Sequence, residues 1–267
     1  MLSKTKFNTL VNYNNIIFIV VLVIIILIIV IILYKKYKKH IDRFEDSYKS
    51  YDGGINKVDQ ILFINLDNRK DRLEAITNQF KSVGVDMEKV HRIPAHYTPG
   101  NGHLGCAKSH LDAVKYAQEN NFENVLVFED DFKFDTNLEQ TNNVFNNLFN
   151  QVNKREWDVI MLTYSYGKPT NSKYSFLNKI TEAQAGSGYI INKSYYPVLI
   201  KTFEKCVANM KSEKTSGVNW EQWALDQVWK ENQKVDRWFS FNPLIGKQDA
   251  ELVSSIQAIT NYNTDKK

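Results

Sequence analysis

The stretch Asn124–Phe134, N-V-L-V-F-E-D-D-F-K-F, is the part of the sequence that decides the fold. Its continuous apolar run, Val125 to Phe128, predicts a buried strand. The run stops abruptly at consecutive carboxylates, Glu129 to Asp131. Because adjacent carboxylates repel one another, such a strand end needs water, cations or a bound metal ion to neutralise it. This run alone leaves two alternatives open, an acidic surface turn and a metal site.

Strands and helices alternate along the chain on both sides of this stretch. Short apolar runs predict strands, and apolar residues that recur every three or four positions predict helices. The predicted strands are residues 61–64, 90–93, 125–128, 159–162, the end of 185–191, and 238–241. The predicted helices are residues 71–83, 104–120, 138–152, 195–206 and 220–230. This alternation predicts an α/β fold.

The N-terminal part contains a long apolar segment. Ile16–Leu33 is uninterrupted Ile, Val, Leu and Phe, long enough to cross a bilayer. A cleaved signal peptide is the alternative, but the run is longer than a usual signal core and no small-residue cleavage site follows it. The predicted organisation is a short tail (1–15), a transmembrane helix (16–34), a charged stalk (35–58), one domain (59–257) and a disordered tail (258–267).

The charges are unevenly divided along the chain. Up to Arg43 the chain holds seven Lys and Arg residues against one Asp, a net charge of +6, so with +4 for the whole chain the remainder carries −2. A weakly acidic globular part argues against nucleic-acid binding. The cluster Lys35–Lys39 favours a cytosolic domain by the positive-inside rule, although it could also hold an anionic lipid surface. Cys106 and Cys206 are too few for a disulfide scaffold.

Asn65–Arg72, N-L-D-N-R-K-D-R, follows the first predicted strand. Ligands of open α/β sheets bind at the carboxyl ends of strands, and Arg69 and Arg72 beside a helix N-terminus suit a diphosphate. The alternative is that Asp67 or Asn68 caps the helix while both arginines are solvated.

Gly105–His110, G-C-A-K-S-H, opens the second predicted helix. Gly105 permits a close approach, and Ser109 and His110 could face a ligand. The alternative for His110 is a structural hydrogen bond. A zinc site is disfavoured because Cys106 and His110, four residues apart, have no obvious second pair of ligands.

Two later motifs suggest an acceptor site. The glycines of A-G-S-G-Y-I-I, residues 185–191, let the backbone approach another group closely. Trp223, Asp226 and Trp229 recur every third residue, which places Asp226 on one helix face with two aromatics and suits a general base. The alternatives are a salt bridge to Lys230 or a hydrogen bond to Gln222.

Taken together, these stretches resemble glycosyltransferase family 25, which contains lipooligosaccharide galactosyltransferases and collagen hydroxylysine galactosyltransferases. The matching pieces are I-N-L-D-N-R-K-D-R (64–72), G-C-A-K-S-H (105–110), L-V-F-E-D-D (126–131), A-G-S-G-Y-I-I (185–191), A-L-D-Q (224–227), P-L-I-G-K-Q (243–248) and S-S-I (254–256). The resemblance implies a GT-A type fold with a mixed central sheet, a UDP-sugar donor such as UDP-galactose, Mn²⁺ and inversion at the anomeric carbon.

The resemblance also implies roles for individual residues. Its metal ligands would be Asp131 first and Glu129 or Asp130 second, with Gln248, Asp249 or water as the third, and hard oxygen ligands suit Mn²⁺ or Mg²⁺. Asp226 would be the catalytic base. Donor-binding residues would be Asn65, Asp67, Arg69, Arg72, Ser109, His110, Glu129 and Asp130, and the acceptor side would hold Gly186, Tyr189 and Trp223.

These expectations combine into a single-pass, metal-dependent glycosyltransferase. It would move a hexose, galactose by preference, to a hydroxyl of a glycan, a lipid-linked glycan or a collagen-like protein. The charge rule places its domain in the cytosol, whereas analogy with collagen-modifying enzymes places it in a lumen. The alternatives are an inactive GT-A-fold protein that binds a glycan or partner, and a membrane scaffold whose acidic loop binds Ca²⁺.

Overall fold

The protein is described by a computed structural model that covers residues 18, 20–38, 53–213 and 220–252. Contacts divide the chain into two units, Met1–Lys49 and Ser50–Lys267. The predicted tails 1–15 and 258–267, most of the stalk, and the S-S-I motif lie outside the described residues.

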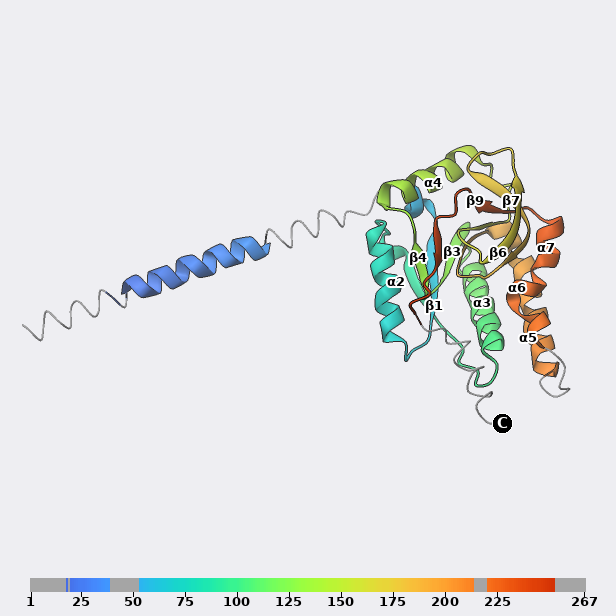
Figure 1. The fold of residues 1–267 in the computed structure, drawn as a ribbon, viewed down its shortest axis with the longest axis horizontal. Coiled ribbons are helices and arrows are strands. Elements are labelled where there is room, and N and C mark those ends of the chain that lie inside the picture. The colour runs from blue at the N-terminus through green and yellow to red at the C-terminus, as the bar shows by residue number, and fades with distance from the viewer. Residues whose placement is uncertain (1–17, 19, 39–52, 214–219, 253–267) are drawn as a thin grey trace, which may run out of the picture. The chain divides into compact units, whose positions relative to one another are not determined.

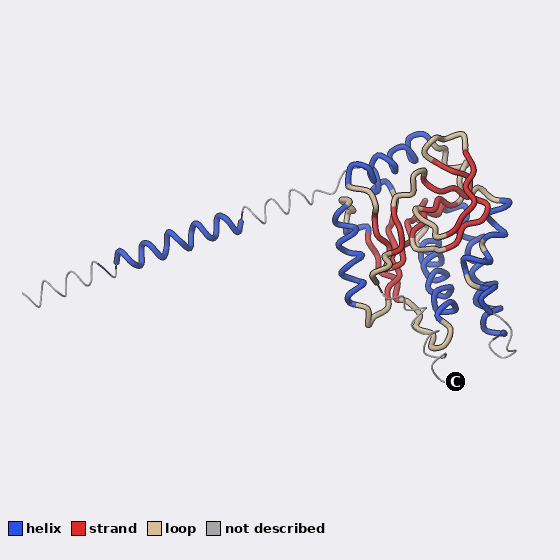
Figure 2. Tube along the Cα trace, in the orientation of Figure 1, coloured by secondary structure: helices blue, strands red, loops and turns tan. Residues whose placement is uncertain are grey.

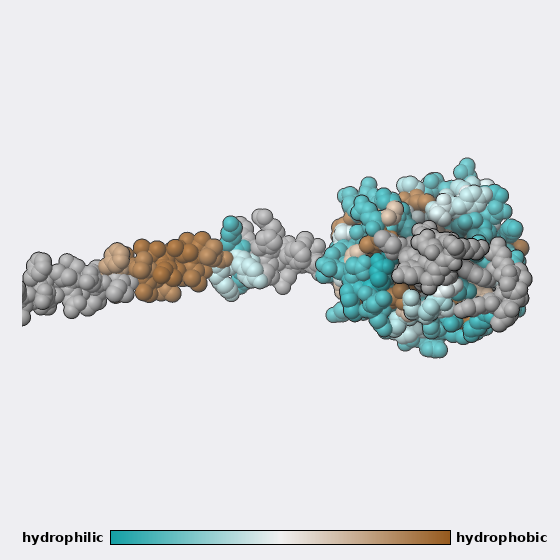
Figure 3. Space-filling view, turned by 60° about the horizontal axis from the view of Figure 1, so that its bottom comes forward, coloured by the Kyte–Doolittle hydropathy of each residue, from teal (hydrophilic) through white to brown (hydrophobic). Residues whose placement is uncertain are grey.

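In the first unit the described helix Val20–Lys38 is long and apolar enough to cross a membrane. Its apolar side chains are exposed along its whole length, whereas the visible surface of the second unit is largely hydrophilic (Figure 3). An exposed face of this kind is costly in water, so the helix fits a membrane segment by length and composition.

The second unit is built on a mixed sheet with strand order β2-β1-β3-β8-β5-β9-β7-β6 (Figures 1 and 2). Strand β8 runs antiparallel to both neighbours, β3 and β5, while β2, β1 and β3 are mutually parallel and β9 is parallel to β5. The strands are β1 (Gln60–Asn65), β2 (Val90–Pro94), β3 (Asn124–Glu129), β5 (Val159–Met161), β6 (Tyr166–Asn171), β7 (Leu177–Gln184), β8 (Gly188–Asn192) and β9 (Trp238–Phe241). A separate ribbon pairs β4 (Phe132–Phe134) with β10 (Gly246–Gln248).

Helices cover both faces of the sheet (Figure 1). The longer helices are α2 (Lys70–Ser82), α3 (Gly102–Glu119), α4 (Leu138–Gln151) and α5 (Tyr196–Glu213), and the shorter ones are α6 (Leu225–Val228) and α7 (Lys230–Val235). Apolar residues of α3, α5 and α6 pack in one core cluster and those of α2 and α4 in another. Successive residues of β3 alternate between the two clusters, which explains why its sequence is continuously apolar.

The predicted fold class is confirmed, a mixed α/β sheet flanked by helices as expected for a GT-A type domain. The bounds of the predicted helices and strands agree closely with the structure up to β5. The hairpin β6–β7 and the ribbon β4–β10 have no counterpart among the predicted elements.

Two predictions are wrong. Residues 54–58 were expected in the stalk, but Ile55 and Val58 are fully buried in the core of the domain. Residues 220–230 do not form one helix, because Ala224 is extended and separates the 3-10 turn Trp220–Trp223 from α6. This break lets Trp229 turn into the core, where its indole N–H donates to the Ala183 carbonyl at 2.8 Å.

Candidate active site

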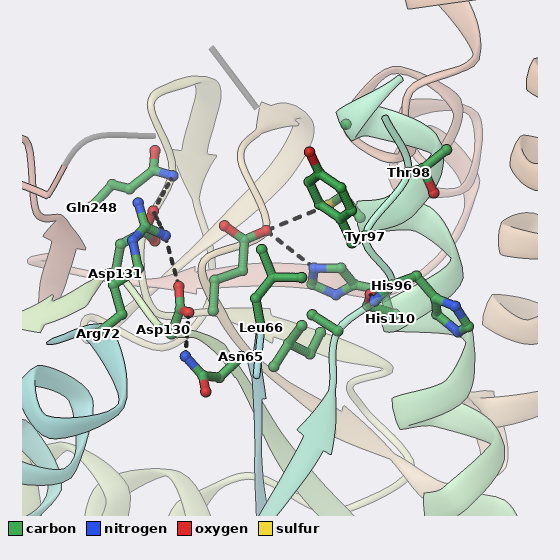
Figure 4. Close-up of a pocket in the computed structure, with 16 residues that line it drawn as sticks. Asn65, Leu66, Arg72, His96, Tyr97, Thr98, His110, Asp130, Asp131 and Gln248 are labelled. Atoms are coloured by element: carbon green, nitrogen blue, oxygen red, sulfur yellow. Dashed lines mark hydrogen bonds and ion pairs between the residues drawn. The ribbon is translucent and has the colours of Figure 1, made fainter. Parts of the chain in front are cut away.

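An open pocket lies at the carboxyl ends of β1, β2 and β3, beside the start of α3 (Figure 4). It contains about 670 Å³ of empty space, part of which is its open mouth. In Figure 4 Asp130 and Asp131 lie toward Gln248, and His96, Tyr97 and Thr98 lie on the other side. The lining residues are Ile64, Asn65, Leu66, Arg72, Ala95, His96, Tyr97, Thr98, Gly102, Cys106, Ser109, His110, Glu129, Asp130, Asp131 and Gln248.

The alternation of β3 directs its first two carboxylates to opposite faces of the sheet. Val125 and Val127 pack in the α3 cluster, and Glu129, two residues on, contacts α3. Leu126 and Phe128 pack in the α2 cluster, and Asp130 contacts Arg72 of α2. One short strand end therefore supplies carboxylates to both sides of the pocket.

Asp130 is fully engaged with its neighbours. Arg72 Nη1 lies 2.7 Å from Asp130 Oδ1, and Asn65 Nδ2 donates to Asp130 Oδ2 at 2.7 Å. Burial raises the pKa of Asp130 above its ordinary value, although Arg72 and Asn65 act in the opposite direction. The contacts give Asp130 an architectural role, since both of its oxygens already have strong donors.

Asp131 keeps one oxygen available. Its Oδ2 accepts from Arg72 Nη1 and from Gln248 Nε2, both at 3.2 Å, whereas buried Oδ1 has no hydrogen-bond partner among the described residues. Burial, together with the nearby charge of Glu129, raises the pKa of Asp131 to about 7. A buried carboxylate oxygen without a donor is costly unless a cation or proton satisfies it.

Glu129 ends a buried chain of hydrogen bonds. His110 Nε2 lies 3.1 Å from Glu129 Oε1, His110 Nδ1 lies 2.7 Å from the Tyr189 hydroxyl, and Cys106 Sγ lies 3.7 Å from the same Oε1. Each ring nitrogen of His110 thus has one partner, and the Tyr189 hydroxyl can either donate to Nδ1 or accept from it. Burial acts to raise the pKa of Glu129, yet hydrogen bonding and charge from His110 hold it below its ordinary value.

The pKa values of Glu129 and Asp131 are therefore shifted in opposite directions. Glu129 ionises first, and its negative charge adds to burial in keeping a proton on Asp131. The hydrogen bonds to Glu129 in the described part of the chain all go to Oε1. Glu129 Oε2 and Asp131 Oδ1 are thus the carboxylate oxygens best placed to serve a cation.

Ser109 shapes the loop that closes the pocket. Its hydroxyl donates to the Gly105 carbonyl at 2.8 Å and accepts from the His96 backbone N–H at 2.9 Å. Gly105 is needed for this approach, because a Cβ there would lie 2.4 Å from the His96 carbonyl oxygen. Ser109 therefore lines the pocket while it fixes the loop that carries His96 to Thr98.

The structure does not bring two predicted donor residues into the pocket lining. Asp67, with its side chain 83% exposed, pairs with Arg92 at 2.6 Å, and Arg69 pairs with Asp71 at 2.8 Å. Arg72 does line the pocket, but it is only 5% exposed and binds the acidic residues. The prediction that Arg69 and Arg72 both face a diphosphate is therefore corrected. Arg69 pairs with Asp71 near the surface, and Arg72 is buried and holds Asp130 and Asp131.

Asp226 lies beside the glycine-rich loop rather than among the residues lining the pocket. Its Oδ2 accepts from the Ala185 backbone N–H at 3.3 Å, and Ala185 has a positive φ of 71°. A Cβ on Gly186 would lie 3.5 Å from His110 Cε1 and 3.1 Å from the Trp229 ring. The loop thus joins Asp226 to the His110 side of the site.

Two predicted acceptor residues are placed differently from expectation. Tyr189 is fully buried with its hydroxyl against His110, so it lies beneath the site, and its predicted place on the acceptor side stays a prediction. Trp223 does not share a helix with Asp226, and its ring packs on the core with Lys205 Nζ 5.9 Å from the ring centroid. Lys230 donates to Gln227 and Gln227 donates to Asp226, so in place of the alternative Asp226–Lys230 salt bridge Gln227 lies between the two residues.

Some lining residues escaped the sequence analysis. His96, Tyr97 and Thr98 lie on the turn-rich loop after β2, and Tyr97 is 64% exposed at the pocket. Their signal was only their place after a predicted strand, where ligands bind in α/β sheets. Asp249, an alternative third metal ligand, has its side chain 3.4 Å from Lys133, whereas Gln248 lines the pocket.

Clustered carboxylates at the carboxyl edge of a mixed α/β sheet, beside an open pocket, are the arrangement that the resemblance to a glycosyltransferase leads one to expect. Residues 88–215 match the family model of glycosyltransferase family 25, described as LPS biosynthesis protein. This match covers just under half of the chain, and over these residues it confirms the resemblance that the motifs indicated. The matched region contains the Gly105–His110, Glu129–Asp131 and Ala185–Ile191 motifs.

Solved structures with distant likeness include transferases. A mannose-1-phosphate geranyltransferase from Thermus thermophilus is 11% identical, with a TM-score of 0.41 over 68% of this chain and 72% of that one. A glycosyltransferase involved in glycosylation of the major capsid of PBCV-1 is 8% identical, with a TM-score of 0.39 over 77% and 98%. A197 from STIV is 11% identical, with a TM-score of 0.35 over 68% and 81%.

Proposed function

We propose that the protein is a metal-dependent, inverting hexosyltransferase that takes galactose or a related hexose from a UDP-sugar. The observation that carries the proposal is the buried Asp131 Oδ1, which has no hydrogen-bond partner among the described residues and lies at the pocket beside Glu129. Either a proton or a cation satisfies such an oxygen, and a bound nucleotide diphosphate favours the cation.

The residues present fit a hard divalent cation. Asp131 Oδ1 and Glu129 Oε2 would be its protein ligands, with the Gln248 amide oxygen as the third, since Gln248 Nε2 is used on Asp131. Oxygen ligands of this kind suit Mn²⁺ or Mg²⁺. When bound, the cation would supply Lewis-acid stabilisation of the charge that develops on the departing diphosphate.

Arg72 would act by holding the acidic pair in place. Its contacts with Asp130 and Asp131 bring these carboxylates together at the end of β3 despite their repulsion. The donor roles of Asn65, Asp67 and Arg69 remain predictions, and only Asn65 lines the pocket.

Asp226 would accept the proton of the attacking acceptor hydroxyl. The Ala185 N–H and the Gln227 amide, 3.3 Å and 3.2 Å away, orient its carboxylate. Inversion needs one such base and no covalent intermediate. The acceptor would be a hydroxyl of a glycan, a lipid-linked glycan or a collagen-like chain, approached along the Gly186 loop.

The helix Val20–Lys38 supports anchoring to a membrane. Three lysines at its end, Lys35, Lys36 and Lys38, favour a cytosolic domain by the charge rule. A cytosolic site would reach lipid-linked or glycan precursors at the membrane face.

A UDP-release assay on the full chain in detergent tests the proposal, with a panel of UDP-sugars, with Mn²⁺ or Mg²⁺ and with chelator. We expect metal-dependent turnover that Asp131→Asn abolishes and that Asp135→Asn, a neighbouring exposed carboxylate paired with Lys247, leaves intact. UDP binding without turnover by any sugar would favour an inactive binding protein. Calcium binding without UDP binding would favour a scaffold.

A further inference from the structure

Three side chains with different metal-binding atoms, a thiol sulfur, an imidazole nitrogen and a carboxylate oxygen, meet on the α3 side of the pocket. Cys106 and His110 come from α3 and Glu129 from the end of β3. Their ligand atoms, one sulfur, one nitrogen and one oxygen, all lie within 4.8 Å of one another. This cluster supplies the partner that Cys106 and His110 lack in the sequence, because Glu129 is distant along the chain and joins them only through the fold.

The spacing of the cluster matches a tetrahedral metal centre. His110 Nε2 and Glu129 Oε1 are 3.1 Å apart, and Cys106 Sγ and Glu129 Oε1 are 3.7 Å apart. Around a tetrahedral zinc ion, neighbouring ligand atoms of these types lie about 3.3–3.6 Å apart. The two distances from Glu129 differ from these values by only a few tenths of an ångström, and the Cys106 and His110 ligand atoms lie within 4.8 Å of each other.

Tyr189 provides the outer contact that such a histidine ligand uses. Its fully buried hydroxyl lies 2.7 Å from His110 Nδ1, so with a metal on Nε2 the ring proton would sit on Nδ1 and be donated to Tyr189. Histidine ligands are commonly oriented by a bond of this kind from the second ring nitrogen. All three cluster residues also line the pocket, which leaves a fourth position for water.

We propose that Cys106, His110 and Glu129 form a binding site for a thiophilic divalent cation such as Zn²⁺, next to the all-oxygen site at Asp131 and sharing Glu129 with it. Binding replaces the Cys106 S–H bond with a sulfur–metal bond and releases one proton to solvent. Sulfur and imidazole ligands select Zn²⁺ over Mg²⁺, whereas the carboxylate and amide oxygens near Asp131 do the opposite.

Glu129 belongs to both sites, which couples them. A cation held by Cys106 and His110 would bind Glu129 Oε1 and place a positive charge beside Oε2, the oxygen assigned to the donor-site cation. This consequence, which rests on the proposed function, makes Zn²⁺ a competitor of Mn²⁺ and UDP-sugar. The Cys106 site itself does not depend on the proposed function.

Cobalt(II) substitution tests the site without an activity assay. The full chain in detergent is titrated with Co²⁺ under reducing conditions, and the near-ultraviolet sulfur-to-cobalt charge-transfer band is recorded. We expect a saturable band with the visible spectrum of tetrahedral cobalt, displaced by Zn²⁺. The band should vanish in Cys106→Ala and persist in Cys206→Ala, which removes a buried thiol of α5 outside the cluster.

No band in the wild-type protein, or a band that survives Cys106→Ala, would overturn the site. X-ray absorption at the zinc edge of the wild-type protein gives a second answer that needs no variant. We expect one sulfur scatterer at about 2.3 Å with nitrogen and oxygen neighbours, and a shell without sulfur contradicts the proposal. If the cobalt band is present but Mn²⁺ with UDP does not weaken it, the Mn²⁺ site at Glu129 fails while the Cys106 site stands.

Discussion

Arg72 Nη1 of α2 lies 2.7 Å from Asp130 Oδ1 at the end of β3, and both side chains are almost fully buried. The same nitrogen lies 3.2 Å from Asp131 Oδ2. A single guanidinium thus compensates two adjacent carboxylates that would otherwise repel each other in a desolvated site. Arg72 therefore stabilises the arrangement of the acidic side chains even when no ligand is bound.

The first prediction concerns the removal of this guanidinium. Arg72→Met keeps the length of the side chain and leaves the carboxylates uncompensated, so we expect a loss of about 3–5 kcal/mol in the free energy of unfolding. Urea unfolding followed by circular dichroism measures it. Arg69→Met is the matched control, because its partner Asp71 is exposed and such pairs contribute about 0–1 kcal/mol. Equal losses in the free energy of unfolding of the two variants would contradict this stabilising role of the buried Arg72 guanidinium.

The second prediction is a pH dependence of metal binding. With its pKa raised to about 7, Asp131 carries a proton below that pH, and the proton competes with a cation for the same carboxylate. We therefore expect Mn²⁺ affinity to rise by about tenfold between pH 6 and pH 8, following the ionised fraction of one group with this pKa. Calorimetric titration at several pH values measures the affinity.

Asp131→Asn is the control for this dependence. The amide cannot titrate, so residual Mn²⁺ binding by the variant should be weak and nearly independent of pH over this range. A wild-type affinity that stays flat from pH 6 to pH 8 would show that Asp131 is not a ligand of the cation.

The parts of the fold that sequence reasoning recovered are those set by local pattern. The run Val125–Phe128 is apolar because both faces of β3 are covered, and its abrupt acidic end marks the pocket edge. The hairpin β6–β7 was missed because β6, an exposed edge strand, has no apolar alternation to reveal it.

Side-chain partners were beyond sequence reasoning for a different reason. The pairing of Glu129 with Cys106 and His110, and of Asp130 with Arg72, depends on which helix covers which face of the sheet. The same holds for Tyr189, which was expected on the acceptor side although β8 is a central strand and its hydroxyl contacts His110. Periodicity identifies a strand but does not identify its neighbours.

The third prediction tests the loop that closes the pocket. In Gly105→Ala the new Cβ would overlap the His96 carbonyl, 2.4 Å away, so the loop carrying Tyr97 has to move. We expect a stability loss of about 1–3 kcal/mol from overpacking and a clear weakening of UDP binding. Gly100→Ala on the same loop meets no atom within 4 Å and should affect stability through its positive φ alone. UDP binding by Gly105→Ala at wild-type strength would exclude a donor-binding role for this loop.

The fourth prediction separates a catalytic from a structural role for Asp226. Asp226→Asn keeps an oxygen that can accept the Ala185 N–H but cannot take up a proton at neutral pH. If Asp226 is the base, kcat should fall by about 10²–10⁴ with UDP-sugar binding unchanged. Asp226→Ala should in addition release Ala185 from its positive φ and lower stability, while Glu231→Gln on the exposed face of α7 should do neither. If Asp226→Asn turns over like the wild type and only Asp226→Ala is impaired, the carboxylate serves the Ala185 turn and the base must be sought elsewhere along the pocket.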